Sequence, residues 1–152
     1  MSTAEFPAAS VADQIELELL VSGLGRFLDE LDVERAPMLF DDDVIVSTLG
    51  GTAEGREAVV AQARRNHQVP TQHLITNVVS EVERDMARIT ANLLVVFADG
   101  PVAAVGPQRV ELPTAGLTLG ERYRFEARRG DAGWRLTRIA VEPVWASGPR
   151  LA

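Results

Sequence analysis

The chain has 152 residues and a formal net charge of -7, it contains no cysteine, and arginine supplies all of its basic side chains. A chain of this length normally folds around one core, so we expect a single domain over residues 1–152 with a core of about residues 10–146. The lack of cysteine excludes disulfides and thiolate metal sites, and we expect no metal and no cofactor.

Charge and hydropathy also limit the partners. The arginines are dispersed instead of clustering with aromatic residues, which argues against nucleic acid. The apolar runs are far shorter than the roughly 20 residues that span a bilayer, so no membrane partner is expected. The beginning of the chain lacks the basic and apolar pattern of a secretory signal, which favours a cytoplasmic location.

An amphipathic helix is predicted from Ser10 to about Leu31. Ser10 is the expected N-cap, and Gly23 and Gly25 would let another backbone come close. Apolar residues recur there at steps of three and four, as one helix face requires: Leu17, Leu20, Val21, Leu24, Phe27, Leu28 and Leu31.

Two shorter helices are predicted next. Asp32 is the expected N-cap of a helix that reaches Phe40, and the three aspartates 41–43 are expected to form a solvated closing turn, followed by a first strand over about residues 44–49. After a turn at 49–52, a third helix is expected from near Gly55 to about Asn66, with His67 on the surface at its end.

The remainder of the chain reads as a meander of strands. The expected strands cover residues 73–82, 87–97, 110–112 with 118–129, and 134–144. Helices followed by such a meander give an α+β fold. The pattern of the last strand slips near Thr137, which indicates a bulge, and the long connection 98–120 is a candidate mobile flap. Tyr123 is expected to face inward, opposite the arginines of its strand.

His73 is the polar group that stands out on the strand 73–82. Strict alternation would place His73, Ile75 and Asn77 on one face, giving an apolar wall with a few polar groups, as in a small-molecule pocket. A buried structural histidine would give the same pattern. Both faces of this strand are largely apolar, so we predict a homodimer formed through the sheet.

Four stretches of the sequence carry a resemblance to a known family. They are FLDELDVERAPMLFDDDV, GGTAEGREAV, TQHLITNVVSEVERDMARITANLLVVF and GWRLTRIAVEPVW, and together they extend from about Gln14 to Trp145. This order resembles the SnoaL-like branch of the NTF2-like superfamily, which includes scytalone dehydratases and polyketide cyclases. The resemblance implies a cone-shaped fold with three N-terminal helices packed in a curved, mostly antiparallel sheet.

The same resemblance implies candidate site residues. Scytalone dehydratases carry an aspartate and a catalytic histidine at the places of Asp29 and His73, whereas their second catalytic histidine has no counterpart in strand 90–98. A carboxylate beside an imidazole can hold its tautomer and assist proton transfer. Asn77, Tyr123 and Trp145 are the candidate substrate-binding residues.

Three functions are compatible with this sequence. One is a cofactor-free lyase, isomerase or cyclase in which Asp29 and His73 move a proton on a small apolar or aromatic cyclic metabolite. Another is a non-catalytic dimeric module that binds such a metabolite in the same pocket. The third is a dimerisation or scaffold role, with a pocket too small for a ligand. An Asp29 carboxylate within hydrogen-bond reach of His73, beside a cavity, would favour the enzyme, and an Asp29 that points to solvent would favour the binding module.

Overall fold

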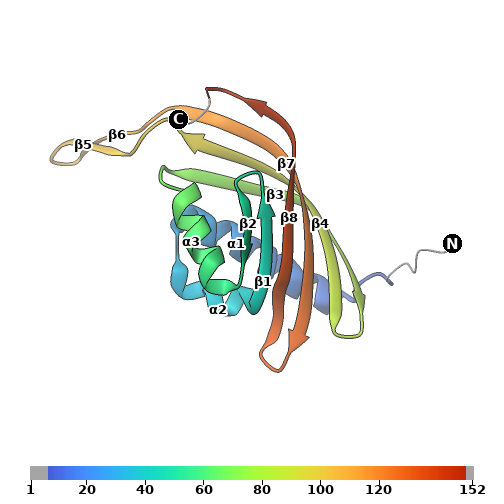
Figure 1. The fold of residues 1–152 in the computed structure, drawn as a ribbon. Helices are drawn as coiled ribbons and strands as arrows, with labels where there is room; N and C mark the ends of the chain where they lie inside the picture. The colour runs from blue at the N-terminus through green and yellow to red at the C-terminus, as the bar shows by residue number, and fades with distance from the viewer. Residues whose placement is uncertain (1–6, 150–152) are drawn as a thin grey trace.

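The computed structural model describes residues 7–149 as a six-stranded sheet that curves around three helices, with a small separate hairpin (Figure 1). The sheet order is β2-β1-β8-β7-β4-β3, and the hairpin is β5-β6. The elements are α1 (Val11–Glu30), the 3₁₀ turn η1 (Val33–Arg35), α2 (Ala36–Leu39), β1 (Phe40–Thr48), β2 (Gly51–Glu54), α3 (Arg56–Asn66), β3 (Thr71–Glu83), β4 (Met86–Ala98), β5 (Ala103–Gly106), β6 (Arg109–Glu111), β7 (Ala115–Gly130) and β8 (Gly133–Ser147).

Helix α1 forms where its periodicity predicted. The Ser10 hydroxyl accepts a hydrogen bond from the backbone N–H of Asp13 at 3.2 Å, which satisfies one free donor at the helix start. The helix ends at Leu31, whose left-handed conformation stops it. Its apolar stripe is buried against the concave face of the sheet, where it forms one core with β4, β7 and β8. The buried residues of this stripe are Leu17, Leu20, Val21, Leu24 and Phe27.

The sheet is mostly antiparallel, as expected. Only β1 pairs with its neighbour β8 in parallel. The bulge predicted near Thr137 is present, because Glu126 pairs with Arg138 while Ala127 pairs with Leu136, which leaves Thr137 as the extra residue. Such bulges increase twist and bend a sheet. The α+β, cone-shaped fold is therefore confirmed.

Two loop predictions were wrong. The aspartates 41–43 lie in strand β1, at a place where the pairing with β8 is irregular, and not in a turn. The Gly51–Glu54 segment, expected to lead from a turn into the third helix, is strand β2 and pairs with residues 45–48 of β1. Within the connection 98–120, strands β5 and β6 form a hairpin that extends away from the rest of the fold (Figure 1).

A second bulge changes the face on which Asn77 lies. In the pairing of β3 with β4, Thr76 is opposite Asn92 and Val79 is opposite Thr90, so β3 has one extra residue. Asn77 has a left-handed backbone (φ 56) and is exposed, while Val78 packs against the core. The predicted common face of His73 and Asn77 is therefore wrong, because strict alternation ends at the bulge.

Candidate active site

The close approach of α1 to β3 positions the first candidate residues. Gly25 lies against β3, and a β-carbon there would be 3.3 Å from Ile75 Cδ1 and 3.8 Å from the His73 carbonyl oxygen. Because residues four apart share a helix face, Asp29 lies one turn further along this same contact. The expectation that glycine lets another backbone come close is correct for Gly25, and it brings Asp29 to His73.

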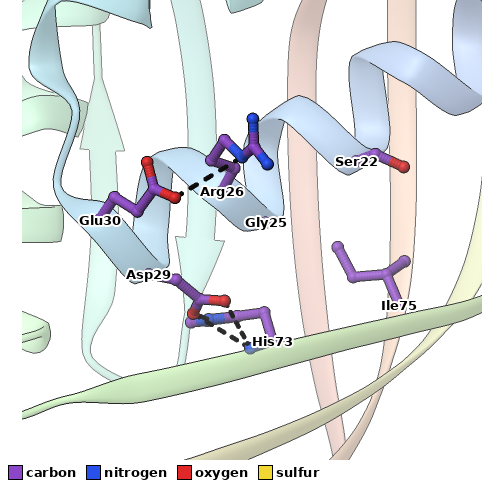
Figure 2. A pocket seen from close by; sticks show the side chains of 7 residues that line it. All are labelled: Ser22, Gly25, Arg26, Asp29, Glu30, His73 and Ile75. Carbon is purple, nitrogen blue, oxygen red and sulfur yellow. Dashed lines mark hydrogen bonds and ion pairs between the residues drawn. The ribbon is translucent and has the colours of Figure 1, made fainter.

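Asp29 accepts hydrogen bonds from three donors, and Figure 2 draws its contacts with His73. The His73 ring atom Nδ1 lies 2.6 Å from Oδ1, the His73 backbone nitrogen lies 3.0 and 3.1 Å from the two carboxylate oxygens, and the Thr71 hydroxyl lies 3.2 Å from Oδ1. The His73 side chain is 4% exposed and that of Asp29 is 26% exposed. The sequence thus placed the members of this pair correctly with respect to each other.

These bonds determine the protonation of the pair. Burial raises the pKa of Asp29, but the hydrogen bonds from His73, the His73 charge and the Thr71 hydroxyl together outweigh burial, so the pKa lies below its ordinary value. A carboxylate only accepts hydrogen bonds, so Nδ1 of His73 carries a proton. In the neutral ring the other nitrogen, Nε2, then has a free lone pair, which is what a general base needs.

His73 separates two spaces of different character. On the side of Asp29 there is a shallow depression of about 280 Å³ between α1 and β3, shown in Figure 2. On the other side is an interior cavity of about 490 Å³, which lies within the usual range for small-molecule sites. Its apolar wall comes mainly from Leu24, Phe27, Leu28, Phe40, Val59, Leu93, Val95, Phe97, Leu119, Ile139 and Val141, and its polar lining includes Gln62, Asn66, His67, His73, Glu121 and Tyr123.

Glu121 and Tyr123 are polar groups buried at this cavity. They are 9% and 3% exposed, and within residues 7–149 neither side chain makes a hydrogen bond, while their polar atoms retain some accessible surface. Burial raises the pKa of Glu121, with His73 partly opposing the effect, and burial together with the charges of Glu121 and Asp29 raises the pKa of Tyr123. A ligand could therefore make the bonds that these two groups lack.

Sequence reasoning placed Tyr123 inside but missed Glu121. The signal was present, since alternation along β7 gives residues 121, 123, 125 and 127 the same parity, and all four are buried. The arginines 122, 124 and 128 and Glu126 occupy the opposite, exposed face, as predicted.

The expectation that His67 is a surface residue was wrong. His67 is half-buried, lines the cavity, and has its ring centroid 5.1 Å from that of His73 and 6.0 Å from that of Phe97. Its Nδ1 lies 2.9 Å from the Ala63 carbonyl oxygen. Burial lowers the pKa of His67, and His73 lowers it further. His67 reaches the cavity because α3 ends there and the chain turns toward β3. No local sequence pattern predicts the direction of this turn.

The other two candidate substrate-binding residues lie away from the cavity. Asn77 is exposed at its bulge. Trp145 is 50% exposed and packs over Gly120, where a β-carbon would clash with the indole ring. Neither belongs to the cavity lining, so their predicted role as direct ligand contacts has no geometric basis in residues 7–149.

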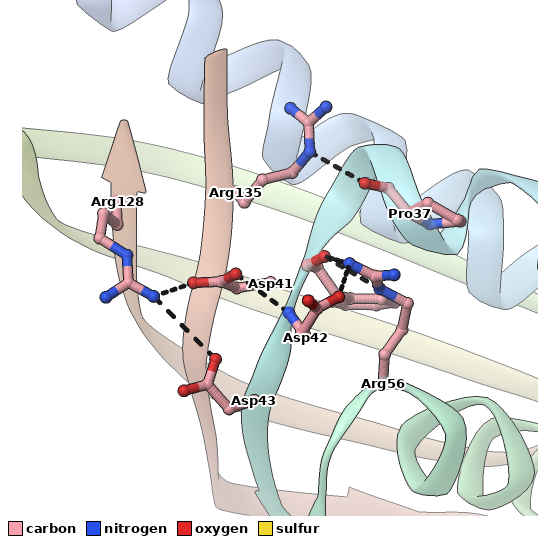
Figure 3. A network of polar contacts seen from close by, with 8 residues as sticks. Pro37, Asp41, Asp42, Asp43, Arg56, Arg128 and Arg135 are labelled. Atoms are coloured by element: carbon pink, nitrogen blue, oxygen red, sulfur yellow. Dashed lines mark hydrogen bonds and ion pairs between the residues drawn. The ribbon is translucent and has the colours of Figure 1, made fainter. Parts of the chain in front are cut away.

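The three aspartates 41–43 are engaged by arginines (Figure 3). Arg128 bonds Asp41 and approaches Asp43 to 4.0 Å, and Arg56 lies 2.7 Å from Asp42. No group of three or more potential metal ligands occurs among the described residues. In that same part of the chain no helix has the length and apolar character needed to cross a membrane.

Comparisons with known proteins agree with this architecture. Residues 9–140 match the SnoaL-like domain family, and the chain belongs to this family. No curated protein matches the chain.

Solved structures with the same fold share little sequence with the chain. A putative aromatic ring hydroxylase from Novosphingobium aromaticivorans is 19% identical (TM-score 0.76; 93% of this chain and 96% of that one). A putative scytalone dehydratase from the same organism is 16% identical (0.73; 93% and 91%). A hexachlorocyclohexane dehydrochlorinase is 18% identical (0.74; 92% and 90%). At these identities the likeness shows the NTF2-like fold alone.

Proposed function

We propose that the protein is a cofactor-free lyase, isomerase or cyclase that transfers a proton on a small, mostly apolar cyclic metabolite. His73 is the general base, and after accepting a proton it becomes the general acid. Asp29 orients the His73 ring and stabilises its charged form. The observation that carries this proposal is the 2.6 Å bond between Asp29 and His73 Nδ1, with His73 in the lining of the cavity of about 490 Å³.

The chemistry of the pair supports an enzyme more than a passive binding site. A carboxylate bonded to Nδ1 keeps the lone pair on Nε2 and favours the imidazolium that forms when a proton is taken up. Asp29 is itself held by the His73 backbone and by Thr71, so the ring orientation is fixed by rigid elements. Dehydration, enolisation and aldol-type ring closure all need such a proton transfer.

The cavity limits the class of substrate. Its wall is mostly aliphatic and aromatic, which suits a cyclic, weakly polar compound. His73 and Tyr123 belong to the polar part of the lining, and we infer that Tyr123 donates a hydrogen bond to a substrate oxygen in this cavity. The fold neighbours named as a dehydratase and a dehydrochlorinase are consistent with elimination as one form of the reaction.

The homodimeric state of the protein is also a proposal. Leu74, Val79, Val144 and Trp145 are exposed large apolar residues on strands of the sheet, which supports the homodimer through the sheet. Sedimentation analysis tests this state, and cell fractionation tests the cytoplasmic location expected from the sequence.

The proposal can be tested without knowing the natural substrate. Cyclic ketones such as 1-indanone, 2-indanone and 1-tetralone contain a carbon-bound proton next to a carbonyl group, and its exchange in D₂O reports enolisation. The protein should accelerate exchange for at least one ketone, and His73→Ala should reduce the acceleration by about 10²-fold or more. An unchanged melting temperature would show that the variant is folded.

Arg124→Gln is a suitable control, because Arg124 is on the outer face of β7 and its carboxylate contact, Glu142, is also exposed. It should retain full activity. If a folded His73→Ala variant exchanged the ketones as fast as the wild type, the catalytic role would be refuted. Binding of the ketones without any exchange would instead favour a non-catalytic binding module.

A further inference from the structure

We propose that His67 is a positioning residue of the cavity, and that its Nε2 accepts a hydrogen bond from a hydroxyl group of the substrate. This inference rests on the proposed function and extends it, because it assigns the substrate to hydroxylated cyclic compounds. It also gives the two cavity imidazoles different roles: His73 moves the proton, and His67 holds the hydroxyl group.

The tautomer of His67 follows from its hydrogen bond to the helix. Nδ1 lies 2.9 Å from the Ala63 carbonyl oxygen, which can only accept, so Nδ1 carries the proton. The backbone N–H of His67 bonds the same carbonyl at 3.1 Å, so the residue is held at the end of α3 by two contacts. In a neutral ring with a proton on Nδ1, Nε2 is a hydrogen-bond acceptor on the far side of the ring.

The surroundings keep this ring neutral. Burial is the largest influence and lowers the pKa of His67, the bond to the Ala63 carbonyl opposes it, and the smaller effects of His73 and Asp29 lower and raise the pKa respectively. Below its pKa the ring would be a donor on both nitrogens, whereas above it Nε2 accepts. At neutral pH the cavity thus presents an acceptor at His67.

This acceptor has no partner within residues 7–149, although the ring lines the cavity. The ring is stacked on Phe97 with 22° between their planes and is tilted by 44° to His73. The three rings lie next to one another. The Nε2 lone pair lies in the plane of the His67 ring, so a substrate hydroxyl group in that plane could donate to it while a reacting carbon lies near His73.

A hydroxyl group is the substrate group that best suits the acceptor Nε2 of His67, because other common groups are excluded. Aliphatic and aromatic C–H groups do not satisfy an imidazole lone pair, and a carbonyl or ether oxygen is itself an acceptor. A phenolic or alcoholic O–H is the common uncharged donor of cyclic metabolites. An amine would compete chemically, but its charged form would have to be buried in an apolar cavity.

Pairs of probe compounds test this assignment. The 4-, 5- and 6-hydroxy-1-indanones and their fluoro counterparts have similar shapes, but fluorine has no proton to donate. Dissociation constants are measured by calorimetry for the wild type, for His67→Phe, which preserves an aromatic ring next to Phe97, and for His73→Phe. For each pair, the dissociation constant of the fluoro compound is divided by that of the hydroxy compound. For at least one pair this ratio should be about 3- to 10-fold larger in the wild type than in His67→Phe.

The His73→Phe variant should retain this preference, because the contact is assigned to His67. If the preference persisted in His67→Phe, or disappeared only in His73→Phe, the proposal would be overturned. Nitrogen-15 NMR of the wild-type histidine rings gives a second test that needs no variant. His67 should be neutral with its proton on Nδ1 at pH 7, and a charged ring or a proton on Nε2 would overturn the proposal.

The two proposals can fail separately. The binding preference needs no turnover, so it can be present even if the ketone exchange does not depend on His73. Conversely, the ketone exchange can depend on His73 even if the hydroxy preference is unchanged in His67→Phe, and that outcome would overturn the positioning role of His67 alone.

Discussion

Two groups of ionisable side chains in this molecule differ in how they are satisfied. At the surface, the aspartates 41–43 are engaged by Arg56 and Arg128. In the cavity, Asp29 and His73 bond one another, but the side chains of Glu121 and Tyr123 make no hydrogen bond within the described part of the chain. The first group has the higher density of charge, and the second has the unused hydrogen-bonding capacity.

This difference distinguishes polar groups that pair with one another from polar groups that can bind a ligand. Exposed ion pairs gain little, since water and salt screen them. A buried polar group without a partner costs stability, and native proteins contain few of them. The cavity groups are therefore the better indication of a ligand site, although the run of aspartates is more conspicuous in the sequence.

The largest expected effect comes from Asp29→Asn. The amide nitrogen would donate toward Nδ1 of His73, so the ring would carry its proton on Nε2 and lose its lone pair at the cavity. Ketone exchange should fall by roughly 10²- to 10⁴-fold. Because the Asn oxygen in the place of Oδ2 can still accept from the His73 backbone N–H, the melting temperature serves as the control. Exchange within about threefold of the wild type would contradict the orienting role.

A smaller effect is expected from Glu121→Gln, which should make the folded protein more stable. The folded pKa of Glu121 is raised, so above its ordinary value of 4.5 the unfolded chain loses the proton first, and stability falls as the pH rises through the folded pKa. A neutral glutamine avoids this loss. It should raise the melting temperature by about 2–5 °C at pH 7 and have little effect at pH 4.

Melting curves at both pH values check this expectation. A variant that is less stable at pH 7 would mean that the ionised carboxylate has a stabilising partner. An equal gain at both pH values would show that the effect arises from packing and not from proton binding.

The smallest effect is expected at the surface group. Arg128→Gln removes the partner of Asp41 on the exposed side of β7, and the melting temperature should change by less than about 2 °C. Ketone exchange should be unchanged, because Arg128 does not line the cavity. A larger loss of stability than in any cavity variant would reverse the contrast between the two groups.

Local patterns predicted much of this structure. The apolar stripe of α1, its Ser10 cap, the end of α3 at Asn66 and the bulge at Thr137 were all visible as periodicity or as a break in it. Alternation also placed Tyr123 inside, and it would have found Glu121 by the same rule. It failed at Asn77, because one inserted residue reverses every face beyond it.

By itself the sequence determined the α+β class, the helix stripe and the pair of residues, Asp29 and His73, that the family resemblance implies. Tertiary structure decided which polar groups meet. The contact of Gly25 with β3 brings Asp29 within 2.6 Å of His73, and the turn after α3 brings His67 next to the same ring. Periodicity describes which face of an element is buried, but the distance between two faces depends on how the elements pack, and that is settled only when the core forms.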